Sequence, residues 1–269
     1  FKLLQIDQTM DLLTGVRNVA DLCAAPGGWS QVLALRLLGS SGDATPQTDE
    51  SKMTDSSCSL PRIVAVDKYL MQPIDGVVQV QGDITHESTA QAVLAEFRGE
   101  RADLVVCDGA PDVTGRADFD EYVQHQLLLS ELRLASALLR PGGSFVAKIF
   151  RGEHAGEVYH HLQQLFREVT CCKPRASRNS SQEAFVVCRG FALPSEYLDP
   201  SGPLYSAERH EALADLGPGS PSLAVPFVLC GSKDDPDADT SYPVDGCHHV
   251  LDPVAPPIDA PYLQAIEER

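Results

Sequence analysis

The chain has little positive charge. Among its 269 residues, 21 Lys and Arg stand against 38 Asp and Glu, which gives a formal net charge of −17 at pH 7. Proteins that bind nucleic acid over a broad surface usually carry a basic excess, so this balance argues against an extended phosphate-binding face. Any contact with nucleic acid is therefore expected to be confined to one part of the chain.

The sequence also lacks long hydrophobic runs and targeting segments. No apolar run reaches the roughly 18 residues that a membrane span requires, and no signal peptide is visible. These absences predict a soluble, cytoplasmic protein. The chain opens on Phe1-Lys2 without a Met, which predicts that it begins inside a longer protein.

Paired cysteine motifs are absent as well. None of the eight cysteines has a C-x-x-C partner, and several fall in apolar strand candidates (Cys23, Cys58, Cys107, Cys171, Cys172, Cys188, Cys230 and Cys247). Buried free thiols in a reducing compartment explain this pattern better than disulfides or zinc ligands. No metal site is predicted.

The glycine pattern G-x-G-x-x-G of dinucleotide-binding proteins is missing too. In its place, an apolar strand over 16–23 runs through the small-residue turn 24–28 into a segment with helical spacing, within the stretch Asp21-Leu-Cys-Ala-Ala-Pro-Gly-Gly-Trp-Ser-Gln31. Such a turn lets a ligand approach the backbone closely. An ordinary βα turn is the alternative. Without the phosphate-binding fingerprint, a ligand lacking phosphates is favoured.

What the chain does contain is an alternation of strand and helix patterns. After an amphipathic helix over 1–13 and the first strand, strands are predicted at 62–67, 76–81, 102–107, 144–150 and 184–188, and helices at 88–97, 119–139 and 154–166. Pro141-Gly-Gly143 is expected to stop the long helix. Alternating βα units of this length predict an α/β fold, a mainly parallel sheet with helices on both faces.

Two segments differ from this pattern. Residues 39–60 are polar and low in complexity, and we expect a disordered insertion there. Residues 191–269 hold twelve of the nineteen prolines, with fourteen acids against three basic residues. The predicted domains are therefore 1–190 and an irregular, acidic, partly disordered C-terminal extension over 191–269.

Three acids follow predicted strand ends, where ligands of open α/β sheets bind: Asp67, Asp83 and Asp108. Asp67 is placed to accept hydrogen bonds from a ribose diol. Any single Asp at such a position is about as well explained as a turn former or helix cap. Three at successive strand ends favour a common binding site.

Four stretches together resemble the FtsJ-type RNA 2′-O-ribose methyltransferases, in family order: 21–31, Gln81-Gly-Asp-Ile-Thr85, Asp103-Leu-Val-Val-Cys-Asp-Gly-Ala-Pro111 and Gly142-Gly-Ser-Phe-Val-Ala-Lys-Ile-Phe150. The resemblance implies a Rossmann-like class I methyltransferase fold with a seven-stranded sheet, including a final antiparallel strand. It also implies S-adenosyl-L-methionine as cofactor. Asp83 would then receive the adenine amino group, and Gly27, Gly28 and Trp29 would line the methionine side. Asp67 and Asp108 would complete the cofactor-binding residues.

The same resemblance implies a catalytic tetrad of Lys2, Asp108, Lys148 and Glu183. Lys148 interrupts an apolar strand, where an unpaired ammonium would be costly. A lysine that snorkels from a sheet edge is the alternative. Whether Lys148 removes the hydroxyl proton or only orients the hydroxyl stays open at this stage.

Positive charge is concentrated near these positions. Residues 140–190 carry eight Lys and Arg against four Glu, and Arg151, Lys173, Arg175 and Arg178 are expected on the rim of the site as phosphate contacts. An exposed turn is the alternative for 173–178.

The tail segments 225–231, 241–243 and 256–261 resemble the eukaryotic tRNA branch of the family. This implies methylation of the tRNA anticodon loop together with auxiliary helical-repeat and WD-repeat subunits, docked in part through the extension. The alternatives are the same chemistry on rRNA, snRNA or an mRNA cap, and a catalytically silent RNA-binding scaffold.

Overall fold

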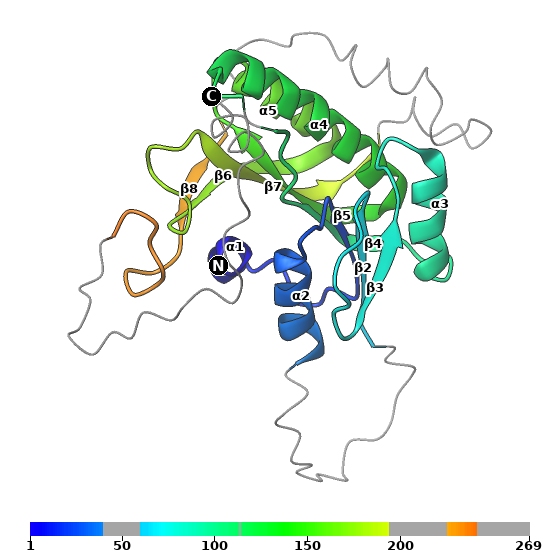
Figure 1. Ribbon diagram of the computed structural model, residues 1–269. Helices are drawn as coiled ribbons and strands as arrows, with labels where there is room; N and C mark the ends of the chain where they lie inside the picture. The colour runs from blue at the N-terminus through cyan, green and yellow to red at the C-terminus, as the bar shows by residue number, and fades with distance from the viewer. Residues whose placement is uncertain (40–59, 113, 194–224, 241–269) are drawn as a thin grey trace, which may run out of the picture. The chain divides into compact units, whose positions relative to one another are not determined.

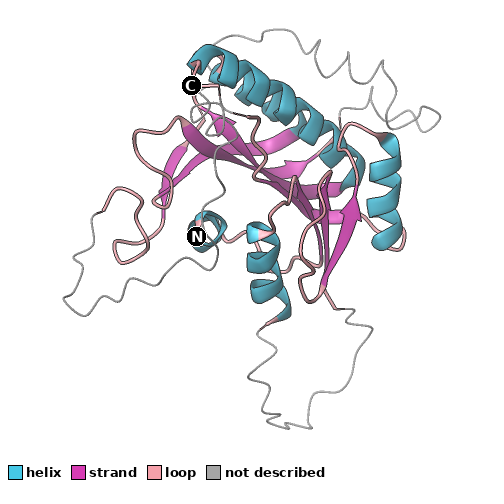
Figure 2. Cartoon of the chain, viewed as in Figure 1, coloured by secondary structure: helices cyan, strands magenta, loops and turns pink. Residues whose placement is uncertain are grey.

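The described part of the chain comprises residues 1–39, 60–112, 114–193 and 225–240 of a computed structural model. The predicted insertion at 39–60 therefore lies almost wholly outside the described residues, as does most of the extension over 191–269. Five helices and eight strands occur in the described part (Figures 1 and 2).

The elements follow one another as an alternation of helices and strands. Their bounds are α1 (Lys2–Met10), β1 (Asn18–Leu22), α2 (Gly28–Leu38), β2 (Arg62–Asp67), β3 (Val77–Gln81), α3 (Glu87–Glu96), β4 (Ala102–Cys107), α4 (Ala117–Leu138), β5 (Leu139–Phe150), α5 (Ala155–Leu165), β6 (Phe166–Pro174), β7 (Glu183–Phe191) and β8 (Phe227–Cys230). Most bounds lie within two or three residues of the predicted ones, because the apolar periodicity is strong.

All eight strands belong to one sheet, in the order β3-β2-β1-β4-β5-β7-β6-β8. Strands β1 to β5 are parallel to one another, whereas β7 is antiparallel to both β5 and β6. The sheet is thus mainly parallel with one inserted antiparallel strand, as predicted. The order reverses between β1 and β4, which is where ligands of such sheets bind.

The expected number of seven strands is one too few. Strand β8 comes from the predicted C-terminal extension and pairs in parallel with β6, with Cys171 opposite Phe227 and Pro174 opposite Cys230. A four-residue strand gives too weak a periodic signal to be recognised before its pairing partner is known. This part of the extension therefore belongs to the sheet.

Helices cover both faces of the sheet (Figure 1). Helices α3, α4 and α5 bury one face with residues such as Val93 and Leu132. Helices α1 and α2 bury the other with residues such as Ile6 and Leu33. Strands β1 and β4 lie in the middle of the sheet and are buried on both faces, which is why they read as continuous apolar runs.

Strand β5 begins earlier than predicted. Ala102 of β4 pairs with Leu139, but Leu104 pairs with Ser144, so the register shifts across Arg140-Pro-Gly-Gly143. Pro141 and the two glycines end the helix and form an irregular bulge within the strand, instead of a separate loop. None of the described helices has both the length and the apolarity needed to cross a membrane.

Candidate active site

The three acids predicted at strand ends share one cavity. Asp67 ends β2, Asp83 follows β3 and Asp108 follows β4, and all three line a cavity of about 680 Å³ at the carboxyl edge of the sheet. Parallel strands bring these ends to one edge, so residues far apart in sequence meet there. Cys23 and Gly109 also border the cavity.

Two of these acids hold turns as well as facing the cavity. Asp67 accepts hydrogen bonds from the Ala25 and Tyr69 amides, at 2.9 and 2.8 Å. Asp83 Oδ1 accepts from the Thr85 amide at 2.8 Å and from the Thr85 hydroxyl at 2.6 Å. These hydrogen bonds from Thr85 lower the pKa of Asp83. The turn-forming and ligand-binding interpretations are therefore compatible, because the turns fix carboxylates that still face the cavity.

Unlike the three acids, the glycine turn and Trp29 do not line this cavity. Gly27 has a φ of 109° and precedes α2, which begins at Gly28. Among the described residues that line the cavity, Gly27, Gly28 and Trp29 do not occur. Trp29 is buried, with its ring centroid 5.5 Å from that of Phe185. Contact of these three residues with a cofactor stays a prediction.

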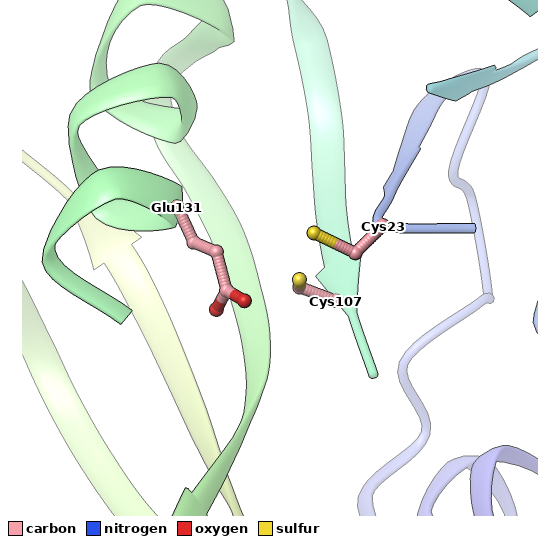
Figure 3. A group of neighbouring side chains, drawn as sticks. All are labelled: Cys23, Cys107 and Glu131. Carbon is pink, nitrogen blue, oxygen red and sulfur yellow. The ribbon is translucent and has the colours of Figure 1, made fainter. Parts of the chain in front are cut away.

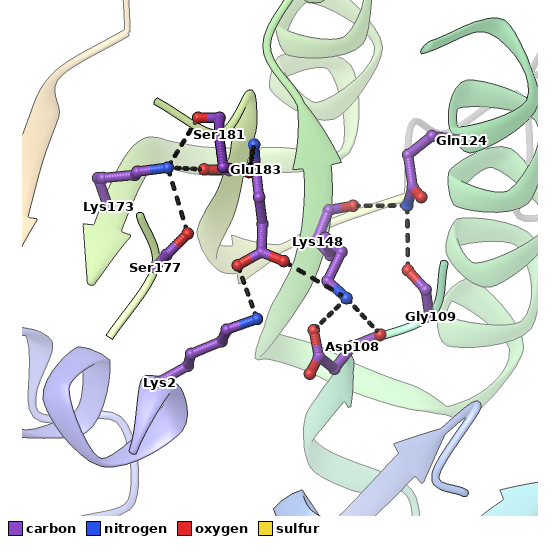
Figure 4. A network of polar contacts seen from close by, with 9 residues as sticks. All are labelled: Lys2, Asp108, Gly109, Gln124, Lys148, Lys173, Ser177, Ser181 and Glu183. Carbon is purple, nitrogen blue, oxygen red and sulfur yellow. Dashed lines mark hydrogen bonds and ion pairs between the residues drawn. The ribbon is translucent and has the colours of Figure 1, made fainter. Parts of the chain in front are cut away.

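The four predicted tetrad residues lie together (Figure 4). Lys148 Nζ lies 2.6 Å from Asp108 Oδ1 and 3.8 Å from Glu183 Oε2. Lys2 Nζ lies 2.7 Å from Glu183 Oε1. Four side chains from α1, the end of β4, β5 and β7 thus form one continuous chain of ion pairs, which adjoins the cavity at Asp108.

Lys148 is held from both its ends. Its side chain is only 9% exposed, and Nζ also donates to the Asp108 carbonyl oxygen at 2.9 Å. Its own carbonyl accepts from Gln124 Nε2, which also donates to the Gly109 carbonyl. A buried ammonium is stable only when it is paired in this way, so the snorkelling alternative is excluded for Lys148.

Glu183 lies between the two lysines of the tetrad. It is the first residue of β7 and lies opposite Phe150 in the antiparallel ladder, which brings it within reach of Lys148. Burial opposes ionisation of Glu183, but the hydrogen bond and charge of Lys2, with smaller contributions from Ser177 and Lys148, lower its pKa. Glu183 is therefore a carboxylate at neutral pH.

One of the expected phosphate contacts is wrong. Lys173 is only 3% exposed, and its ammonium donates to the Ser177 hydroxyl and to the carbonyls of Ser181 and Glu183. The Lys173 ammonium is therefore buried at the end of β6 and cannot reach a phosphate in solvent. Its hydrogen bonds instead support the turn that leads to Glu183. In the sequence, Lys173 looks like any exposed lysine at the end of a strand, so its burial could not be predicted.

The other three basic residues are more accessible. Arg151 and Arg178 are exposed, and the Arg151 guanidinium lies over the Phe227 ring at 4.8 Å. Arg175 pairs with Asp237 at 2.6 Å, which ties the strand β6 turn to the described end of the extension. The predicted basic rim is thus reduced to Arg151 and Arg178, with Arg175 partly neutralised.

A buried polar group beside the tetrad was not predicted (Figure 3). The sulfurs of Cys23 and Cys107 and a carboxylate oxygen of Glu131 lie within 4.8 Å of one another. Burial raises the pKa of Glu131 to about 8 and also raises the pKa of Cys107, so the neutral forms are favoured at pH 7. The available signal was Glu131 itself, an ionisable residue in the apolar face of α4 between Leu128 and Leu132.

The sequence analysis also missed Gln124, which lies on the same face of α4 as Glu131, seven residues earlier.

Asp21 is a further buried acid. Burial raises its pKa to about 7, and its carboxylate accepts a hydrogen bond from the Ser30 hydroxyl at 2.6 Å. Asp21 therefore fastens β1 to the first turn of α2, beneath the glycine turn.

Comparison with known proteins agrees with this geometry. The model of the FtsJ-like methyltransferase family matches residues 1–191. The chain is 47% identical to a human tRNA (cytidine(32)/guanosine(34)-2′-O)-methyltransferase, over 98% of this chain and 76% of the relative. It is 46% identical to the Schizosaccharomyces pombe protein of the same name, over 99% of this chain and 88% of that one.

A Drosophila melanogaster tRNA (guanosine(34)-2′-O)-methyltransferase is 43% identical over the whole chain and 80% of the relative. Among solved structures, a ribosomal RNA methyltransferase from Plasmodium falciparum has a TM-score of 0.58 and 20% identity, over 72% of this chain and 96% of that chain; this likeness concerns the fold alone. With the family match spanning the whole sheet up to β7, the chain belongs to the FtsJ-like methyltransferase family.

Proposed function

We propose that this chain transfers a methyl group from S-adenosyl-L-methionine to ribose 2′-hydroxyls of tRNA, at nucleotides of the anticodon loop. The observation that carries the proposal is the ion-paired chain Lys2, Glu183, Lys148 and Asp108 at the edge of the 680 Å³ cavity. The names of the relatives given above support tRNA as the RNA.

The cavity offers hydrogen-bond acceptors and negative charge that suit this cofactor. Its carboxylates Asp67 and Asp83 offer acceptors for a ribose diol and an exocyclic amino group, and Asp108 brings negative charge toward the tetrad. When bound, S-adenosylmethionine supplies a methyl group on a positively charged sulfur. Carboxylates attract such a charge, and they do not repel it as they would a phosphate.

Lys148 is the residue proposed to contact the nucleophilic hydroxyl. An ammonium has three donor positions, and two of them are directed at Asp108 Oδ1 and the Asp108 carbonyl. The third faces Glu183 at 3.8 Å, which is too long for a hydrogen bond. A ribose hydroxyl could occupy this gap, where the Lys148 ammonium would donate to the oxygen and orient it for attack, whereas only the neutral amine form of Lys148 would accept the hydroxyl proton.

Lys2 and Glu183 would act as positioning residues. Lys2 keeps Glu183 ionised, and Glu183 in turn fixes the side of Lys148 at which the hydroxyl would lie. Phosphates on either side of the methylated nucleotide would meet the exposed Arg151 and Arg178. Such a short basic rim suits a few phosphate contacts, in keeping with the acidic total charge.

The proposed setting is the cytoplasm, with auxiliary helical-repeat and WD-repeat subunits docked in part through the C-terminal extension. The experiment should delete residues 241–269 and not 191–269, because β8 and Asp237 are bonded to β6 and its turn. Loss of partner capture with an unchanged melting temperature supports docking through this segment. Undiminished capture contradicts it.

The decisive experiment compares the parent chain with Lys148→Ala. Nucleoside mass spectrometry would follow 2′-O-methylation of tRNA, rRNA, snRNA and capped mRNA. We expect methylation of tRNA by the parent and a fall of roughly 10²-fold or more in the variant, with unchanged binding of S-adenosylhomocysteine. If the parent chain methylates another of these RNAs better than tRNA, the substrate named in the proposal is wrong. If the parent chain binds RNA but methylates none, a scaffold role is favoured.

A further inference from the structure

One buried group of side chains has no role in the proposed reaction (Figure 3). It consists of Cys23, just after β1, Cys107, the last residue of β4, and Glu131 of α4. The two sulfurs and one carboxylate oxygen lie within 4.8 Å of one another, and the Glu131 side chain is directed toward both sulfurs. Three elements that are far apart in the sequence therefore bring three candidate ligand atoms together.

Glu131 is the unusual member of this group. It is 0% exposed, and neither of its carboxylate oxygens has a hydrogen-bond partner among the described residues. The thiols beside it are only weak donors. Because a buried polar group without a partner is costly, each one in a folded protein calls for a proton, a water molecule or a bound ligand to explain it. A cation held by the carboxylate would remove this cost.

The backbone of Gly109 leaves the space that the group needs. A Cβ atom at this position would lie 2.6 Å from Glu131 Oε1 and 3.2 Å from Cys23 Sγ, so any side chain there would displace the carboxylate and crowd the thiol. Gly109 directly follows Asp108 and, like Cys23, borders the 680 Å³ cavity. The group therefore packs against the backbone that carries one carboxylate of the tetrad.

Two thiols and a carboxyl group are a donor set for a borderline-soft divalent cation. Zn²⁺ is bound in proteins by Cys sulfur at about 2.3 Å and by carboxylate oxygen at about 2.0–2.2 Å. In a tetrahedral site these bonds place the ligand atoms roughly 3.6–3.8 Å apart, so the three atoms need to approach one another by about 1 Å at most. Mg²⁺ and Ca²⁺ prefer oxygen ligands, so the sulfurs select against them.

The surroundings can balance the charge of such an ion. In the metal-free chain, burial raises the pKa of Cys107 and of Glu131, which favours their neutral forms. Zn²⁺ would displace one proton from each thiol and one from the carboxyl group, and these protons would pass to solvent. The ligands then carry one negative charge in excess of the ion's charge, and the positive charge of Lys148 acts on Glu131.

We propose that Cys23, Cys107 and Glu131 form a binding site for one Zn²⁺ ion where β1, β4 and α4 meet. Three protein ligands leave a fourth position for a water molecule. The bonds would tie the ends of two central strands to the helix that covers them, so the expected role is to stabilise this edge of the sheet. No C-x-x-C spacing marks the site in the sequence, because each ligand comes from a different element.

The test is metal binding to the full parent chain, freed of metal by a chelator and kept reduced by a phosphine, with no RNA or cofactor present. Zn²⁺ is titrated against a chromophoric chelator, and Co²⁺ serves as the spectroscopic probe. We expect one Zn²⁺ per chain, a thiolate-to-metal charge-transfer band with Co²⁺, and a melting temperature that rises with added Zn²⁺. A parent chain that binds no Zn²⁺, or that binds Co²⁺ without this band, overturns the proposal.

Cys107→Ala and Glu131→Gln each remove one ligand, and Cys188→Ala is the matched control. Cys188 is a free thiol buried in the same part of the core as Cys107, and it lies outside the group. Each ligand variant should weaken Zn²⁺ binding by roughly 100-fold or more, because loss of a residue that only supports a ligand already costs about 10–100-fold. The control should bind Zn²⁺ as the parent does.

Melting temperatures of the metal-free proteins show whether the variants fold. If Cys107→Ala does not fold, Glu131→Gln decides alone, since the amide matches the carboxyl group in size. Parental affinity in either folded ligand variant places the ion elsewhere and overturns the proposal. The experiment measures no methyl transfer, so its failure leaves the proposed function intact, and an inactive methyltransferase would leave the metal site intact.

Discussion

Lys2 Nζ lies 2.7 Å from Glu183 Oε1, so the first residue of α1 holds the first residue of β7 although 180 positions separate them in the chain. The opposite oxygen of the same carboxylate faces Lys148. One carboxylate therefore connects two lysines, and we expect the ionisation of Glu183 to determine how the Lys148 side chain is positioned.

Replacing Lys2 by Met should shift the pH dependence of methyl transfer. Burial disfavours the Glu183 carboxylate and Lys2 is the main group that lowers its pKa, so without Lys2 this pKa rises. We expect the acid limb of the pH–rate profile to move to higher pH. At pH 7 the rate should fall by roughly tenfold, less than the roughly 10²–10⁴-fold of a lost proton-transfer group.

The measurement is kcat between pH 5 and 9, with Lys233→Met as control because Lys233 is exposed and outside the tetrad. A profile of Lys2→Met that falls in height without moving along the pH axis would contradict this positioning role.

Asp83→Asn should weaken cofactor binding. The aspartate keeps its charge because hydrogen bonds from Thr85 lower its pKa, and it faces the 680 Å³ cavity. The amide loses an acceptor toward an amino group, so we expect the dissociation constant of S-adenosylhomocysteine to rise about tenfold. Titration calorimetry measures it. Asp75→Asn, an exposed position outside the cavity, should bind like the parent, and equal affinities for both variants would exclude Asp83 from the site.

Glu131→Gln should change how stability depends on pH. Burial raises the pKa of Glu131 from 4.5 to about 8. The folded chain therefore keeps a proton that the unfolded chain releases above pH 4.5, so the stabilisation is complete below pH 4.5 and is lost as the pH rises to about 8. Glutamine is neutral throughout and escapes this loss.

We expect the melting temperatures of parent and Glu131→Gln to be similar at pH 5 and the variant to be higher at pH 8. Calorimetric scans would show the difference as several degrees, since each kcal/mol corresponds to about 2–4 °C in a domain of this size. A constant difference across the range would mean that Glu131 does not titrate there. Asp21, whose pKa is raised to about 7 by burial, supplies a residual slope of the same sign in both proteins.

Lys173→Met and Arg178→Ala should separate structure from RNA binding. Met leaves the carbonyls of Ser181 and Glu183 without their donor, and each unsatisfied buried group costs roughly 1–3 kcal/mol. Its melting temperature should drop by several degrees. Arg178 is exposed, so its removal should leave the melting temperature unchanged and reduce the salt slope of tRNA binding by about 1. A stable Lys173→Met protein with weakened RNA binding would restore the original interpretation of Lys173.

The regular elements could be predicted because their signals are local. Strands β2 and β4 coincide with the predicted ranges, since a strand buried on both faces reads as an unbroken apolar run. Strands β6 and β8 and the early start of β5 were not predicted in this way. Four residues of β8 acquire strand structure through pairing with β6, and the start of β5 depends on a bulge opposite Ala102.

The sequence by itself determined the alternation of strands and helices, the acids at the strand ends and an amine within the apolar strand β5, because each is a property of neighbouring residues. Only the tertiary structure decided which charges meet. It buried Lys173, which looked like a surface cation, and placed the Gln124 amide where it donates to the carbonyls of Gly109 and Lys148. Burial and pairing depend on contacts between distant elements, and local patterns carry no record of those contacts.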